Sequence, residues 1–164
     1  MMKRVLDTFC NGLRVLLGIL VAALAIPVGL QVISRYTDLL PPYLWTEELS
    51  TFIFVWVVMI GSMVAVWDGT HFDVQVLPDA KTPLGILLQK GVVLVLVAGF
   101  ALIFFWYGIE YAKFGALQES PMMRANKLIT FISVPIAGAV WAIFSLYRLA
   151  EAIGEYRTSL RAAS

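Results

Sequence analysis

Two adjacent carboxylates, Glu47 and Glu48, are the side chains of this sequence best placed for specific polar chemistry. They open an uncharged apolar segment that ends at Asp68. One interpretation is that they only stabilise the start of a helix, because the helix dipole favours anions there. The other is that one of them makes a specific polar contact at a membrane boundary. The candidate cations for such a contact are Arg35, Arg124 and Lys127.

The other reactive side chains are too few for a catalytic or metal centre. The single cysteine, Cys10, excludes an intramolecular disulfide and any iron–sulfur or metal site built from several cysteines. The single histidine, His71, excludes a haem held by two histidines of this chain. A lone loop histidine more often hydrogen-bonds or packs than binds a metal. We therefore expect no catalytic residue, no metal and no cofactor in this chain.

The charged residues divide the chain into segments long enough to cross a membrane. Hydrophobic residues make up 60% of the 164 positions and charged residues only 14%, with a net charge of +1. The mean hydropathy of +0.85 is too high for a soluble domain. The near-neutral charge argues against a nucleic-acid partner.

Four uncharged stretches of 19 or 20 residues stand out, at 15–34, 49–67, 91–109 and 128–147. Each matches the roughly 20 residues that a membrane-spanning helix needs. The sequence therefore predicts an all-α integral membrane protein with one membrane domain over residues 1–164. Its four transmembrane helices are expected at 13–34, 46–68, 84–109 and 128–148.

Local signals indicate how these helices begin and end. Thr46 is expected to cap the second helix, and Gly69 to end it in a left-handed conformation. Pro27 removes one internal hydrogen bond from the first span and is expected to bend it, and the fourth span carries Pro135. The tail beyond Arg148 keeps a helical spacing of apolar residues, which predicts an interfacial amphipathic helix at the C-terminus.

The second helix has two different faces at 100° per residue. One arc, which includes the small residues Gly61 and Ala65, is shared by Glu47, Phe54, Val58, Gly61 and Ala65. Bulky side chains share the opposite arc: Trp45, Phe52, Trp56, Met63 and Trp67. Small residues allow membrane helices to approach closely. We therefore expect Glu47 to point into this chain's own bundle. Glu48 and the bulky arc are expected to face a partner or lipid.

The basic residues predict the orientation in the membrane. Eight of the twelve lie in the N-terminus, the second connection and the tail, and four lie in the first and third connections. By the positive-inside rule both termini, and with them Cys10, are cytoplasmic. Glu47 and Glu48 are then on the outer side.

Taken together, these features resemble the small membrane subunit of the TRAP (tripartite ATP-independent periplasmic) transporters. The resemblance covers nearly the whole chain through ordered pieces: Arg35-Tyr36, Trp45-Thr46-Glu47-Glu48-Leu49, Phe54-Val55-Trp56, Gly61, Gly69-Thr70-His71-Phe72-Asp73-Val74 and Pro135. The chain departs from the family at Gln75, where an aspartate is common.

The resemblance implies a non-catalytic scaffold subunit in the inner membrane of a bacterium. Its partners would be lipid, a large membrane subunit that carries substrate and sodium, and a periplasmic binding protein that delivers an organic acid. Sodium would bind to the large subunit, so no cofactor is expected here. The residues implied for the subunit interface or structural motif are Arg35, Trp45, Glu47, Glu48, Phe52, Trp56, Gly61, Gly69, His71 and Asp73.

Three other classes of protein are less consistent with the sequence. A stand-alone exporter of small solutes, working as a homo-oligomer, would need a carboxylate within the membrane, but no charge lies in the middle of any predicted span. A membrane enzyme would need a nucleophile with its base, or metal ligands. A redox anchor would need a second histidine. The exporter is the alternative that we retain.

Overall fold

The protein is helical in the part of the chain that the structure, a computed structural model, describes: residues 2–37, 41, 43–69 and 83–163. The helices are α1 (Met2–Tyr36), α2 (Trp45–Asp68), α3 (Pro83–Ala116), α4 (Leu128–Phe131) and α5 (Ser133–Ala163). Within these residues, four segments are long and apolar enough to cross a membrane: Met2–Tyr36, Trp45–Asp68, Leu84–Ala116 and Leu128–Thr158. The predicted all-α membrane fold with four spanning helices is confirmed.

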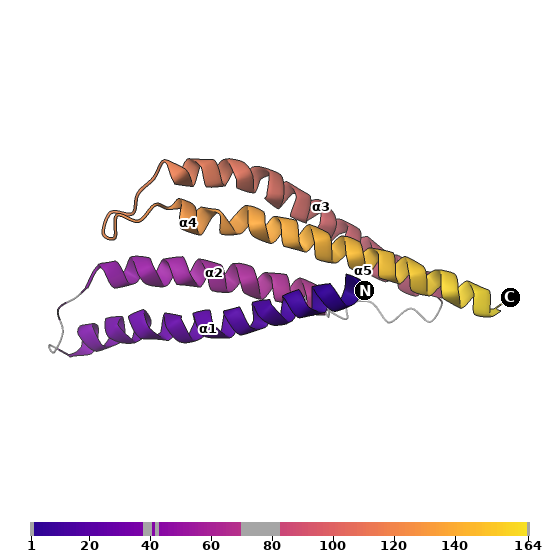
Figure 1. Ribbon diagram of the computed structural model, residues 1–164, viewed down its shortest axis with the longest axis horizontal. Coiled ribbons are helices and arrows are strands. Elements are labelled where there is room, and N and C mark those ends of the chain that lie inside the picture. Colours follow the sequence, from indigo (N-terminus) through magenta and orange to yellow (C-terminus); the bar gives the residue numbers. More distant parts are fainter. Residues whose placement is uncertain (1, 38–40, 42, 70–82, 164) are drawn as a thin grey trace.

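The long helices lie side by side in a layer, in the order α1, α2, α5, α3 (Figure 1). Helix α2 packs against α1 on one side and against α5 and α4 on the other. Helix α5 in turn packs against α3, so α1 and α3 form the two edges. A layer one helix thick leaves much apolar surface uncovered by the chain itself.

The ends of α2 differ in how well the sequence predicted them. Gly69 adopts the expected left-handed conformation, with φ 73°, and its N–H donates to the carbonyl of Ala65 at 3.0 Å. The predicted cap by Thr46 is wrong, because α2 already begins at Trp45. The Thr46 hydroxyl instead donates to the carbonyl of Tyr43 at 2.6 Å, outside the helix.

The fourth span consists of two helices separated by Ile132. Pro135 lies in the first turn of α5 and has no N–H to donate to the carbonyl of Phe131, which accounts for the interruption. The expected interfacial C-terminal helix is not a separate element, because α5 continues unbroken to Ala163. At 1.5 Å per residue α5 is about 46 Å long, so it exceeds the roughly 30 Å hydrocarbon core of a bilayer.

Helices α3 and α5 pack with their backbones almost in contact. A Cβ atom at Gly138 would lie 2.6 Å from the backbone nitrogen of Phe105. A Cβ at Gly108 would lie 2.8 Å from the nitrogen of Pro135. Glycine is therefore required at both positions, and this contact makes α3 and α5 a tightly joined hairpin.

Candidate functional site

The connection between α3 and α4 is a compact turn at one end of the layer (Figure 1). Two backbone hydrogen bonds cross this turn. The N–H of Ser120 donates to the carbonyl of Ala125 at 2.9 Å, and the N–H of Lys127 donates to the carbonyl of Gln118 at 3.0 Å. Arg124 completes the turn with a positive φ of 51°. The N–H groups of Met122 and Met123 are left free of this internal pairing and need an acceptor.

The Glu48 carboxylate is that acceptor. It receives the N–H of Met123 at 2.8 Å, the N–H of Met122 at 3.1 Å and the hydroxyl of Ser120. Ser120 is almost fully buried. One side chain of α2 therefore holds the α3–α4 turn. This contact joins α2 to the hairpin that α3 and α5 form. We name Glu48 with Ser120, Met122 and Met123 the carboxylate clamp.

The clamp supports the interpretation that one carboxylate of the pair makes a specific polar contact. Its donors, however, are not the cations that we expected. Glu48 makes a specific polar contact, but to a hydroxyl and backbone N–H groups, and it forms no ion pair with a candidate cation among the described residues. Arg35 lies exposed in the last turn of α1. A hydroxyl and backbone N–H groups are uncharged, so a search of the sequence for cations does not find them.

The expected directions of the two glutamates are wrong. Glu48, expected to face a partner or headgroups, is bound within the chain. Glu47, expected to point into the bundle, is exposed and forms no ion pair in the described part of the protein. The physical reason is that α2 turns its bulky arc, and not its small-residue arc, toward α5.

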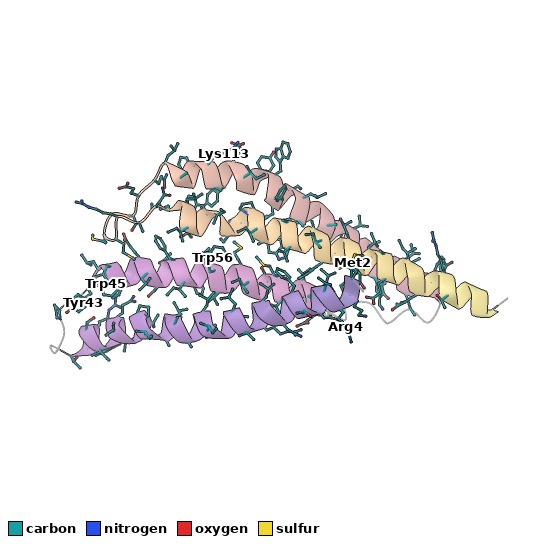
Figure 2. All side chains as sticks on the ribbon, viewed as in Figure 1. Met2, Arg4, Tyr43, Trp45, Trp56 and Lys113 are labelled. Carbon is teal, nitrogen blue, oxygen red and sulfur yellow. The ribbon has the colours of Figure 1, made fainter. Side chains whose placement is uncertain are left out.

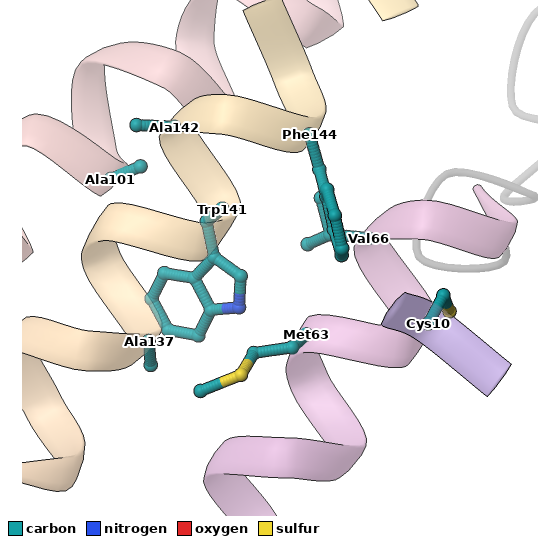
Figure 3. Packing of buried hydrophobic residues seen from close by; sticks show 8 residues of the cluster. All are labelled: Cys10, Met63, Val66, Ala101, Ala137, Trp141, Ala142 and Phe144. Carbon is teal, nitrogen blue, oxygen red and sulfur yellow. The ribbon is translucent and has the colours of Figure 1, made fainter. Parts of the chain in front are cut away.

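The bulky arc of α2 packs inside the chain. The indole N–H of Trp56 donates to the carbonyl of Ile129 in α4 at 3.0 Å, and Trp56 lies between α2 and α4 (Figure 2). Met63 is only 2% exposed and extends toward Ala137 and Trp141 of α5 (Figure 3). For Trp56 and Met63, the prediction that the bulky arc faces lipid or a partner is therefore wrong.

The remaining predicted residues of α2 divide between its neighbours and its free surface. Phe52 is half-buried, whereas Trp45 is exposed and its ring packs 6.2 Å from that of Tyr43. Gly61 faces α1, because a Cβ there would lie 3.9 Å from the side chain of Leu17. Phe54 is 55% exposed, although it belongs to the same predicted arc as Gly61.

The opposite end of the layer holds a second polar junction that the sequence analysis did not select. The indole N–H of Trp67 donates to Asp7 of α1 at 3.2 Å, and its ring lies 4.8 Å from that of Phe144 and 5.8 Å from that of Tyr147, both in α5. Asp68 forms an ion pair with Arg14 of α1. Helix α2 is therefore joined to both neighbours here.

Arg148 contributes to the same junction from α5. Its guanidinium lies against Gly69 and 3.5 Å from the carbonyl of Val66, at the C-terminal end of α2, where a cation is favoured by the helix dipole. A signal for this junction exists in the sequence. Arg14 opens the first apolar segment, Asp68 ends the second and Arg148 ends the fourth, so alternating spans place all three at one membrane boundary.

Two predicted residues lie outside the described residues, His71 and Asp73, as does Gln75. Among the residues that are described, no group of three His, Cys, Asp or Glu side chains is arranged to hold a metal ion. The contacts that the described residues make at both ends of α2 are hydrogen bonds, ring packing and an ion pair.

Comparison with known proteins places this architecture in a family. Residues 24–155 match the family model described as "Tripartite ATP-independent periplasmic transporters, DctQ component". No curated protein matches the chain. The matched region covers more than half of the chain and includes all of α2, the α3–α4 turn and the carboxylate clamp. The chain therefore belongs to the DctQ family, the small membrane subunit of the TRAP transporters.

Proposed function

We propose that this chain is the non-catalytic scaffold subunit of a sodium-coupled, binding-protein-dependent secondary transporter for organic acids. The DctQ family is a component of a transporter and not a family of enzymes. As a chain of this family with four spanning segments, it is a multi-pass protein of the bacterial inner membrane. A large membrane subunit would carry the substrate and the sodium ions, and a periplasmic protein would deliver the substrate.

One observation carries the scaffold role: the middle of every spanning segment is uncharged. Transporters that move ions through the membrane generally use ionisable side chains at that depth. Two carboxylates lie at opposite ends of α2, where Glu48 accepts hydrogen bonds from the α3–α4 turn and Asp68 pairs with Arg14. These charges hold helices to each other, as a supporting subunit requires.

Reconstitution into liposomes separates the scaffold from the alternative, a homo-oligomeric exporter. The purified chain alone should take up no organic acid under a sodium gradient. Uptake should require the large subunit and the binding protein from the same organism. Sodium-driven uptake by this chain alone would contradict the scaffold role and support the exporter.

We further propose that both termini are cytoplasmic, so that the carboxylate clamp lies on the periplasmic side. Cys10 is 0% exposed and is a poor probe of orientation, because a thiol reagent cannot reach it in the folded protein. In a Cys10→Ala background, single cysteines at two exposed positions provide matched probes: Val5→Cys in α1 and Leu117→Cys beside the α3–α4 turn. A membrane-impermeant maleimide added to intact spheroplasts should label only the cysteine at position 117. Labelling only at position 5 would reverse the orientation.

A further inference from the structure

One stripe of α2 faces neither of its neighbours. Its members follow helical spacing along the first half of the helix: Glu47, Thr51, Phe54 and Val58, all exposed. On one side of this free stripe, Ser50 accepts a hydrogen bond from Gln31 of α1 at 2.9 Å. On the other side, Trp56 binds α4. The free stripe of α2 therefore points away from the layer between two occupied sides.

The free stripe combines a charge with apolar side chains. Glu47 has no ion pair within the described chain, whereas the carboxylate of Glu48, the next residue, accepts hydrogen bonds from three donor groups. Phe54 and Val58 are 55% and 48% exposed in the membrane-spanning part of the helix. A carboxylate above an apolar seam matches a helix that carries a cation at the same level.

The edge of the layer at α3 has a different chemical character. Its most exposed aromatic residues, Trp106 and Tyr107, lie within one turn of Glu110. Tryptophan and tyrosine at the end of a span are typical of the boundary between lipid and water. Glu110 is paired with Lys113 of the same helix at 2.8 Å. The α3 edge is thus suited to lipid without a protein partner.

We propose that the free stripe of α2 is the seam for a transmembrane helix of the large subunit, and that a Lys or Arg of that helix pairs with Glu47. The inference rests on the proposed function, which supplies the partner. Helices pack with their axes 8–10 Å apart. A helix over α2 therefore also approaches α1 and α5, whereas a helix at an edge has one neighbour. Paired opposite charges would then fix its position along the seam.

Co-purification with the large subunit from the same organism tests this seam through two matched pairs of variants. Glu47→Lys should weaken retention of the large subunit about tenfold or more, because it places like charges together. Glu110→Lys, an exposed glutamate near the end of α3, should have no effect. Val58→Trp should obstruct the seam, whereas Leu96→Trp, at an exposed position of α3, should not. The thermal stability of each isolated variant controls for folding.

Cross-linking identifies the partner residue without relying on a bulky or charged substitution. In a Cys10→Ala background, Phe54→Cys should cross-link to the large subunit. Replacing the nearest Lys or Arg of the large subunit with Glu should restore retention of Glu47→Lys. Absence of the cross-link, with both α2 variants still retaining the partner, would mean that the stripe faces lipid and would overturn the proposal.

Two further outcomes separate the seam from the function itself. If the α3 variants lose the large subunit and the α2 variants keep it, the interface lies at α3, so the seam is wrong and the scaffold role stands. If the wild-type chain does not co-purify with the large subunit, even under conditions in which uptake is preserved, the proposed function is wrong. The proposed seam is then wrong as well.

Discussion

The two ends of the helical layer are held together by different means. At one end, the carboxylate clamp joins α2 to the α3–α4 turn through a single side chain, that of Glu48. At the other end, α2 is joined to α1 and α5 through separate contacts: an indole hydrogen bond, aromatic packing, an ion pair and the Arg148 guanidinium. We call this second set the Trp67 junction.

The difference determines how each end should respond to mutation. Three donors depend on the Glu48 carboxylate, so removing it leaves all three without their acceptor at once. The contacts of the Trp67 junction involve different pairs of residues, so the loss of one leaves the others in place. A buried donor left unsatisfied costs more than the net value of its hydrogen bond, and Ser120 is buried. The carboxylate clamp should therefore be the more sensitive end.

The largest effect is expected from Glu48→Ala. The hydroxyl of Ser120, a residue that is 2% exposed, and the N–H groups of Met122 and Met123 would lose their acceptor. We expect a loss of several degrees in the melting temperature of the isolated subunit. Proteolysis should become faster within residues 117–127.

Glu47→Ala is the matched control for this substitution, because Glu47 is the adjacent exposed glutamate with no ion pair among the described residues. It should leave both melting and proteolysis unchanged. Equal behaviour of the two variants would show that the clamp contributes nothing and that the pair only begins a helix.

Gly69→Ala should have the next largest effect and tests the Trp67 junction. An alanine there must adopt φ 73°, which costs about 1–2 kcal/mol, and its methyl group would collide with the Arg148 guanidinium. Gly99→Ala is the control, because a Cβ at Gly99 meets nothing within 4 Å and the helix favours alanine. Chemical or thermal unfolding should separate the two. A neutral Gly69→Ala would mean that the end of α2 adjusts freely.

Trp67→Phe should have a smaller effect. Phenylalanine keeps an aromatic ring beside Phe144 and Tyr147, whereas the hydrogen bond to Asp7 and some packing of the larger indole ring are lost. A typical hydrogen bond contributes about 0.5–1.5 kcal/mol to stability. The Asp7→Asn variant, which retains an acceptor, should lose less than Trp67→Phe. A loss as large as that of Glu48→Ala would contradict a distributed junction.

The sequence predicted the four spans well and their lengths less well. The uncharged stretches located each helix, and α2 agrees with the expected range to within one residue. Helix α1 extends further than expected, to include Lys3 and Asp7. Hydropathy reports the part of a helix that suits lipid, whereas charged residues outside that part can remain helical.

The candidate site was found only in part, for a reason that the second helix illustrates. A helical wheel separates two faces of α2 but does not show which of them meets α5. The structure shows that Met63, from the bulky arc, lies in one buried cluster with Ala137 and Trp141 of α5 (Figure 3). The hydrogen-bond partners of Glu48 could not be predicted from the sequence either. The N–H groups of Met122 and Met123 become available only through the shape of the turn.

The smallest effect is expected at the ion pair between Lys3 of α1 and Glu151 of α5, which are 2.6 Å apart. Both side chains reach solvent, at 60% and 35% exposure, and exposed pairs of this kind contribute little once water and salt screen them. Lys3→Gln should therefore leave the melting temperature of the isolated subunit unchanged, at low and at high salt. The same should hold for Glu151→Gln and for the double variant, because no other described contact depends on this pair. A clear decrease in the melting temperature of either single variant, matched by a similar decrease when salt is added to the wild-type subunit, would contradict this expectation. It would show that the Trp67 junction depends on electrostatic attraction. In that case the contrast with the carboxylate clamp would be one of degree, since both ends would then depend on a few charges.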